Sequence, residues 1–239
     1  MESTETTIAA NYQSVRERMA AACRRAGRDP DSVTLVAVTK YAELEWIRAL
    51  VGLGVVELGE NRPQQLVARA AQVASPVHWH LIGHLQRNKV RSILPLVALI
   101  HSADSLRLLE AVNRIAAALD VKPRVLIEVN LSGEDAKHGF RADDLRSQWD
   151  QIVALEQIRL GGLMTMAAYS PDPENARPAF RQLCELRDEL QARSGAGHLK
   201  DLSMGMTGDF EVAIEEGATL VRIGSALWQG LSPGGGISN

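Results

Sequence analysis

The sequence predicts a (β/α)8 barrel of the TIM type with an extra helix at its N-terminus. Three observations predict this fold. Short apolar runs alternate with amphipathic stretches eight times along the chain, which is typical of a parallel sheet covered by helices. The length of 239 residues suits one such barrel. Polar side chains follow the apolar runs where barrel strands would end, and this rim is where barrel proteins bind their ligands.

The elements follow from the alternation in chain order. An opening helix is expected over residues 7–27. The apolar runs predict strands over 34–39, 55–58, 78–82, 96–101, 124–130, 159–163, 201–204 and 220–223. The amphipathic stretches predict helices over 44–53, 63–73, 87–93, 105–119, 142–155, 174–192, 209–216 and 225–229. No linker or low-complexity tract divides residues 1–239, so a single domain is expected, with a frayed tail over 232–236.

Composition excludes several classes of function. The net charge is −3 and no long basic run occurs, so neither nucleic acid nor an anionic membrane surface is an expected partner. No stretch approaches the ~20 apolar residues of a membrane helix, and no signal peptide is visible. Cys23 and Cys184 lie far apart in helix-like segments, which indicates reduced thiols. A cytoplasmic location is therefore expected.

Lys40 closes the apolar run 33–39, so the predicted first strand leads into an ammonium group. Lysine is almost never fully buried without a partner, so this position requires an explanation. The plain explanation is a side chain that extends to solvent from the end of the strand. The functional explanation is an amine that reacts with an aldehyde ligand at the barrel rim.

Two turns near the C-terminus favour the functional explanation. Residues 203–208 and 222–225 carry glycines and hydroxyls, and each turn follows an apolar run. Such turns direct backbone N–H groups at an anion such as phosphate, and Gly205 allows the backbone to approach a ligand closely. Capping of the next helix by side chains of the same turn is the alternative. An amine facing a phosphate-binding turn indicates a phosphorylated aldehyde held on Lys40 as an imine.

A metal site is the rival hypothesis for this rim. His78, His80 and His84 have metal-ligand spacing, because alternate strand residues share a face. A barrel-type metal hydrolase would need further histidines at later strand ends and an aspartate at the last one. Arg222 lies there instead, and its charge would repel a metal. No metal site is therefore expected; His80 is expected to pack near the ligand, and the other two histidines to be solvated.

Six short motifs occur in one order between about residues 33 and 230. They are Ala37-Val38-Thr39-Lys40, Gly59-Glu60-Asn61, Trp79-His80-Leu81-Ile82-Gly83-x-Leu85-Gln86-x-Asn88-Lys89, Gly161-Gly162-Leu163-Met164, Ser203-Met204-Gly205-Met206-Thr207-x-Asp209, and Val221-Arg222-Ile223-Gly224. On these motifs the sequence resembles the pyridoxal-phosphate homeostasis protein family. The fold of that family is like the barrel domain of alanine racemase.

The resemblance implies the cofactor and the roles of individual residues. Pyridoxal 5′-phosphate would form an internal aldimine with Lys40. Asn61 and Met164 would line its ring, and Arg222 would lie near the phosphate or the pyridine ring. The phosphate would be held by Ser203, Thr207, Gly224 and Ser225. With His80 and Gly205, the expected cofactor-binding set is Lys40, Asn61, His80, Met164, Ser203, Gly205, Thr207, Arg222, Gly224 and Ser225, with no catalytic residue.

The sequence departs from the family pattern in loop positions. His84 stands where many relatives have proline, and Arg62 stands where an aromatic residue is common. Residues 227–230 replace a shorter aromatic–glycine ending. None of these changes removes a residue needed for the imine or the phosphate. The segment 137–140 is expected to be either a mobile lid or a plain surface loop.

Intracellular storage, buffering or delivery of the cofactor is the function that the resemblance favours. Apo-enzymes that use the same cofactor are then candidate recipients, and a monomer is expected. The alternative is an amino-acid racemase, which needs a second acid/base opposite the imine. Related enzymes take that group from an additional β-domain, and this sequence ends just after the eighth strand and helix. Tyr12, Tyr41 and Tyr169 offer no obvious substitute. A protein-docking function of the outer helices stays open.

Overall fold

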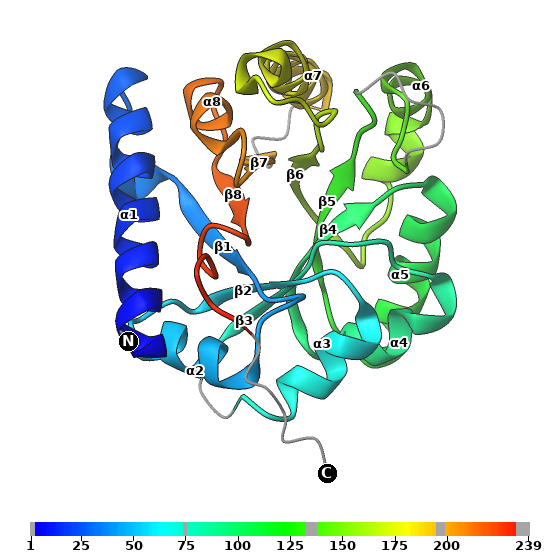
Figure 1. The fold of residues 1–239 in the computed structure, drawn as a ribbon. Helices are drawn as coiled ribbons and strands as arrows, with labels where there is room; N and C mark the ends of the chain where they lie inside the picture. Colours follow the sequence, from blue (N-terminus) through cyan, green and yellow to red (C-terminus); the bar gives the residue numbers. More distant parts are fainter. Residues whose placement is uncertain (1–2, 74–75, 132–137, 195–198, 233–239) are drawn as a thin grey trace.

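The computed structural model describes residues 3–73, 76–131, 138–194 and 199–232. Within them, eight parallel strands close into a barrel in the order β1 to β8 (Figure 1). The strands are β1 (Thr34–Val38), β2 (Glu57–Glu60), β3 (His78–Leu81), β4 (Val97–Ala103), β5 (Arg124–Glu128), β6 (Arg159–Met164), β7 (Asp201–Met206) and β8 (Leu220–Ile223). Pairing of β1 with β8, as in Thr34 with Leu220, closes the ring. The predicted barrel is confirmed.

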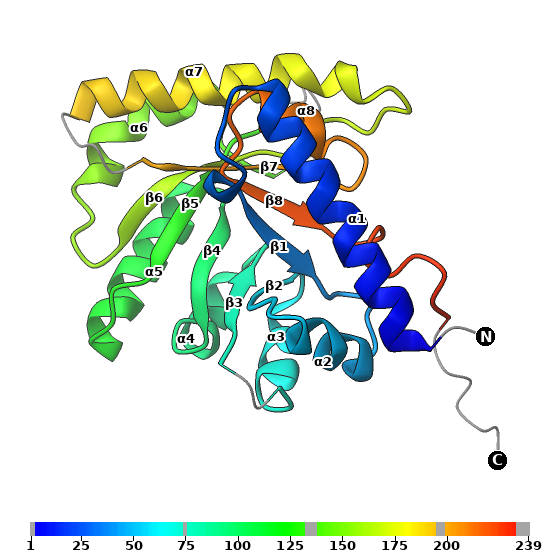
Figure 2. The ribbon, with the colours of Figure 1, turned by 90° about the vertical axis from the view of Figure 1, so that its left-hand side faces the viewer.

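Helices cover the outside of the ring (Figures 1 and 2). The α-helices are α1 (Thr4–Arg25), α2 (Leu44–Gly52), α3 (Pro63–Ala70), α4 (Val90–Ile93), α5 (Leu106–Leu119), α6 (Ala142–Val153), α7 (Arg177–Ser194) and α8 (Phe210–Glu215). Single 3-10 turns are η1 (Pro30–Ser32), η2 (Arg87–Lys89) and η3 (Pro173–Ala176). In the part of the chain that the structure describes, none of the helices combines the length and apolar character that a bilayer crossing requires.

The extra N-terminal helix is confirmed. α1 lies on the outside of the barrel against α2 and α8 (Figure 2). Its first turn is capped by Ser3, whose hydroxyl accepts from the backbone N–H of Thr6. Asn11 on α1 donates to the backbone oxygens of Leu227 and Gln229, at 3.1 and 2.9 Å. The helix therefore also fixes the segment that follows β8.

Several predicted bounds differ from the structure by a few residues, and two differences are informative. The second strand starts two residues later than predicted, at Glu57, because pairing with His78 on β3 sets its register. Residues 225–229 form consecutive turns and not a helix. Their backbone bonds join residues three apart, as from the Leu227 N–H to the Gly224 oxygen at 2.9 Å. Of the segments singled out above, residues 137 and 233–236 lie outside the described residues.

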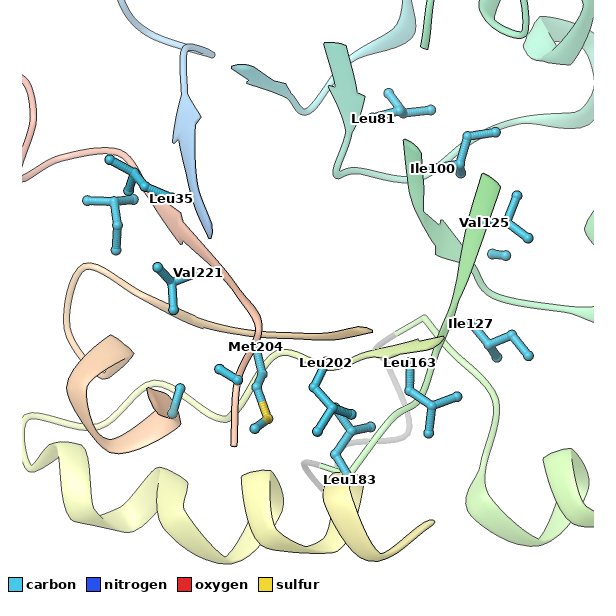
Figure 3. Packing of buried hydrophobic residues seen from close by; sticks show 14 of the residues in the cluster. Leu35, Leu81, Ile100, Val125, Ile127, Leu163, Leu183, Leu202, Met204 and Val221 are labelled. Carbon is cyan, nitrogen blue, oxygen red and sulfur yellow. The ribbon is translucent and has the colours of Figure 1, made fainter. Parts of the chain in front are cut away.

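Two apolar layers hold the barrel together. The larger one lies between the strands and the helices; Figure 3 shows Leu163 of β6 and Leu202 of β7 beside Leu183 of α7. Neighbouring strand residues point to opposite faces, so the smaller cluster fills the inside of the ring. It consists of Val36, Leu99, Leu126, Met164 and Leu220. Cys23 and Cys184 are free thiols.

Candidate functional site

A pocket of about 630 Å³ lies at the carboxyl ends of the strands, beside β1, β2 and β8. This volume is within the range of small-molecule sites. Six of the ten residues predicted to bind a cofactor line it: Lys40, Asn61, Thr207, Arg222, Gly224 and Ser225. They lie at the ends of four strands, β1, β2, β7 and β8, or in the connections that follow them, and only barrel closure brings these together.

Four predicted residues do not line this pocket. Met164 is fully buried in the apolar cluster inside the ring. His80 and Ser203 are buried below the pocket in a hydrogen-bonded chain. Gly205 has φ +91°, and a Cβ there would lie 2.5 Å from the Ala213 Cβ. The structure thus gives Gly205 a packing reason for being glycine, namely the close contact of β7 with α8.

Lys40 lies two residues beyond the end of β1, in the turn before α2. It is exposed and lies on the wall of the open pocket, as both explanations of this position allow. Its Nζ is 5.0 Å from the centre of the Tyr41 ring, which also lines the pocket. The amine is therefore accessible to a ligand and lies close to an aromatic face.

Arg69 on α3 holds the turn that carries Lys40. Its guanidinium donates to the Thr39 backbone oxygen, and to the Ala42 backbone oxygen at 2.9 Å. The same group pairs with the fully buried Glu60 at 2.8 Å. Thr39 Oγ1 donates to the same Glu60 oxygen at 2.5 Å. Because both carbonyl groups flank Lys40, this buried ion pair fixes the path of the backbone on either side of the amine.

Glu60 is an imperfectly satisfied carboxylate. Its second oxygen, Oε2, has no hydrogen-bond partner among the described residues. Burial raises its pKa, although Thr39 and Arg69 act in the opposite direction. The charge of Glu60 therefore depends on Arg69 for its stabilisation.

The turn after β7 offers unpaired backbone donors to the pocket. Asp209 Oδ1 accepts from the Met206 N–H at 2.6 Å, and the Asp209 N–H donates to the Met206 oxygen at 3.1 Å. These two bonds close the turn around Thr207 and Gly208. The N–H groups of Thr207 and Gly208 have no acceptor among the described residues, and both residues line the pocket. The turn is thus preorganised for an anion.

A second set of unpaired donors follows β8. The Ser225 N–H and hydroxyl have no partner within the described part of the chain, and Ser225 lines the same pocket. Trp228 fixes this segment, because its Nε1 donates to the Val38 oxygen at 2.9 Å. Its ring stacks on Trp46, with centroids 6.1 Å apart. Both indoles also form part of the pocket wall.

Arg222 is the buried cation of the pocket. It is 3% exposed, and Nη1 donates to Ser203 Oγ at 2.6 Å while Nη2 donates to the Thr165 backbone oxygen at 3.0 Å. Burial lowers the pKa of Arg222 to about 10, although Asp209 and Glu128 raise it. The guanidinium therefore remains protonated at neutral pH.

A polar chain leads from Arg222 down through the barrel interior. Ser203 Oγ lies 2.8 Å from His101 Nδ1, and His101 Nε2 lies 2.8 Å from His80 Nδ1. His80 Nε2 reaches Glu57 Oε2 at 2.6 Å. With neutral imidazoles, one proton arrangement satisfies every link: each residue from Arg222 onward donates to the next, and Glu57 is the final acceptor.

The charges at the two ends of this hydrogen-bonded series, Arg222 and Glu57, agree with that arrangement of protons. Burial lowers the pKa of His101 well below its usual value, and His80 and Arg222 lower it further. Burial alone would raise the pKa of Glu57, but hydrogen bonds from His80 and His78 outweigh this and lower it. A carboxylate at one end and a guanidinium at the other thus orient the neutral groups between them.

The three histidines with metal-ligand spacing are not brought together. His78 and His80 both contact Glu57, at 2.7 and 2.6 Å. His84 instead bonds to Asp104 at 2.9 Å. Because β3 ends at Leu81, His84 lies in the connection beyond it, where alternate-face spacing no longer applies.

Several site residues escaped the sequence reasoning. Trp46 and Trp228 look like ordinary helix and tail residues, and Arg69 like a solvated helix cation. Their functional positions arise from contacts between segments distant in sequence. The segment 227–230 was the signal for Trp228, since it departs from the family ending.

The chain is similar to known proteins in sequence and in fold. The family model for the alanine racemase N-terminal domain matches residues 6–233. A pyridoxal phosphate homeostasis protein of Aquifex aeolicus is 42% identical over 90% of this chain and 94% of its own length. The structure of PipY from Synechococcus elongatus PCC7942 with PLP bound has a TM-score of 0.79 and 35% identity, over 89% of this chain and 99% of PipY. A Bifidobacterium adolescentis protein described as unknown has a TM-score of 0.86 and 39% identity, over 95% and 96% of the two chains.

Proposed function

The chain belongs to the pyridoxal phosphate homeostasis protein family, and from this premise we propose that it binds pyridoxal 5′-phosphate in the pocket at Lys40. Its function would be the intracellular homeostasis of that cofactor, through storage, buffering or delivery. One observation carries the proposal: Thr207, Gly208 and Ser225, whose N–H groups have no acceptor among the described residues, line the same pocket as an exposed lysine amine.

The donor set fits the chemistry of this cofactor. A phosphate needs several fixed N–H and O–H donors, which the turns after β7 and β8 offer together with the hydroxyls of Thr207 and Ser225. An aldehyde needs an accessible amine, which Lys40 supplies. The planar ring would lie between these groups, with Asn61 at the pocket wall. When bound, the cofactor would supply an electrophilic aldehyde and a conjugated ring.

Arg222 favours a binding function over amino-acid chemistry. A guanidinium beside the ring nitrogen disfavours its protonation, and an unprotonated ring is a weaker electron sink. Ser203 and Thr165 fix the guanidinium, so it cannot turn away easily. The titratable side chains on the pocket wall of the described residues are Lys40, Tyr41 and Arg222. The Tyr41 ring lies beside the Lys40 amine, with Nζ 5.0 Å from its centre, whereas a racemase needs a base on the opposite face of the imine.

The test of binding is a covalent map of the cofactor. The protein is incubated with pyridoxal 5′-phosphate, reduced with borohydride, digested, and analysed by mass spectrometry. The label is expected on Lys40, and Lys40→Ala should remain colourless. Lys122→Ala, an exposed lysine next to β5, is the matched control and should label as the parent does. A label on another lysine, or none, contradicts the proposal.

Turnover separates the two candidate activities. The loaded protein is incubated with single L-amino acids in deuterium oxide, and exchange at the α-carbon is followed by NMR. A homeostasis protein should show no sustained exchange, whereas a racemase should show many turnovers. Recipient apo-enzymes, a monomeric state, a cytoplasmic location and one domain over residues 1–239 are further parts of the proposal.

A further inference from the structure

A cluster of two histidines and an aspartate lies outside the pocket described above. His84 follows β3, Asp104 follows β4, and His138 precedes α6 in the connection after β5. One ligand atom from each of the three lies within 4.8 Å of the others. His84 Nδ1 is 2.9 Å and His138 Nδ1 is 3.9 Å from the same Asp104 oxygen, Oδ2. Two imidazoles from distant segments thus converge on one carboxylate oxygen.

The imidazole rings also lie against each other. Their centroids are 4.4 Å apart with an interplanar angle of 18°. The side chains of His84 and His138 are 44% and 63% exposed, whereas that of Asp104 is 10% exposed. The carboxylate is therefore fixed and largely shielded from water, while both imidazoles can rotate about their side-chain torsions.

A second carboxyl group lies near Asp104. Glu128, at the end of β5, is 4% exposed, and its carboxyl has no hydrogen-bond or ion-pair partner among the described residues. Asp104 is close enough to raise the pKa of Glu128, which burial already raises. In the ion pairs between described residues, Asp104 faces imidazoles and no lysine or arginine.

We propose that His84, Asp104 and His138 bind a divalent transition-metal ion, with zinc as the expected species. Two imidazoles and one carboxylate favour zinc-type ions over magnesium and calcium, which prefer oxygen ligands. Zinc–nitrogen bonds of about 2.0 Å place neighbouring ligand atoms about 3.3 Å apart in a tetrahedron. The ligand atoms lie within 4.8 Å of one another, so zinc binding requires the exposed imidazoles to bring their nitrogens closer by up to about 1.5 Å. A solvent molecule would complete the four ligands.

Such an ion would connect three strand-to-helix connections at the barrel rim. Asp104 lies on the short segment between β4 and α5, and His138 lies two residues before Phe140, which pairs with Val129 after β5. Metal binding would therefore hold the connection before α6 against the ends of β3 and β4. This site is separate from Lys40, so it does not depend on the proposed cofactor.

The test is a zinc titration of tag-free, chelator-treated protein without added pyridoxal 5′-phosphate. Competition with a chromophoric chelator should give one zinc ion per chain. His84→Asn and His138→Asn should each weaken zinc binding at least about tenfold, since even outer residues of metal sites change affinity by 10–100-fold. Cobalt substitution should give visible d–d absorption that both variants lose.

His78→Asn is the matched control. His78 is also an exposed histidine bonded to a carboxylate, that of Glu57, but it lies at the start of β3. This variant should bind zinc as the parent does. Three results would each overturn the proposal: no zinc on the parent, full binding by the double variant His84→Asn/His138→Asn, or equal loss in His78→Asn. Circular dichroism of each variant shows that the fold is retained, as expected for exposed positions.

Discussion

Replacing Arg69 by methionine should destabilise the protein strongly, although the residue lies on a helix that is partly exposed to solvent. The Arg69 side chain is 17% exposed and Glu60 is 0% exposed, so the variant leaves a buried carboxylate without its cation. It also removes the donors to the Thr39 and Ala42 oxygens. Removing one partner of a buried pair costs about 3–5 kcal/mol.

Thermal unfolding measures this loss. For a protein of this size, each kcal/mol changes Tm by about 2–4 °C, so Tm should fall by at least about 6 °C. The control is Arg48→Met, because Arg48 is exposed and makes a single long bond of 3.4 Å, to the Gln72 backbone oxygen. Its effect should stay within about 0.5 kcal/mol.

The double variant Arg69→Met/Glu60→Gln separates charge from packing. Since Glu60→Gln removes the unpaired charge, the double variant should recover part of the lost stability. Labelling of Lys40 by pyridoxal 5′-phosphate should still be slower than in the parent, because the double variant also lacks the Arg69 hydrogen bonds to the Thr39 and Ala42 backbone oxygens. Equal Tm values for Arg69→Met and Arg48→Met would refute the reasoning.

Three further predictions follow from the site. Burial and Asp104 raise the pKa of Glu128 from 4.5 to about 7, so its stabilising contribution is complete below about pH 4.5 and is lost as the pH rises through about 7. With chelator present, the free energy of unfolding of Glu128→Gln should exceed that of the parent by about 3 kcal/mol at pH 8 and should be similar at pH 4.5. Urea titrations at the two pH values measure this difference. Thr207→Val and Ser225→Ala should each weaken retention of pyridoxal 5′-phosphate about 10- to 100-fold in equilibrium dialysis. The reason is that a hydrogen bond to a charged group contributes about 1.5–3 kcal/mol. The control variant Ser147→Ala should retain the cofactor as the parent does. Ser203→Ala should lower the free energy of unfolding by about 1–3 kcal/mol in urea titrations, because His101 and Arg222 each lose a buried partner; stability equal to that of Ser147→Ala would contradict the hydrogen-bonded chain.

Local sequence predicted the bounds of a strand well where both of its faces are buried. β8 begins and ends where the apolar run 220–223 does, because both of its faces are covered. The second strand was placed two residues early, since Val55 and Val56 look more strand-like than Glu57. Glu57 is tolerated because His78 and His80 pair with it, and those partners are distant in sequence.

The site was predicted in part. Lys40, Thr207 and Ser225 follow strands and Arg222 lies near the end of β8, and any closed parallel barrel brings such positions to one rim. Ser203 belongs to the same motif as Thr207, but the alternation of β7 turns its hydroxyl into the barrel interior, onto His101 and Arg222. A motif shows which residues are close in sequence, and the pleat of the strand determines which of them reach the pocket.

The sequence by itself determined the barrel, the lysine that follows its first strand and the glycine-bearing turns after its last two strands, because periodicity and turn chemistry are local properties. Only the tertiary structure decided which side chains face the pocket, that Arg69 clamps the Lys40 turn, and that His84, Asp104 and His138 converge. These arrangements depend on strand register and ring closure. Both are set by contacts between segments tens of residues apart, which no local pattern encodes.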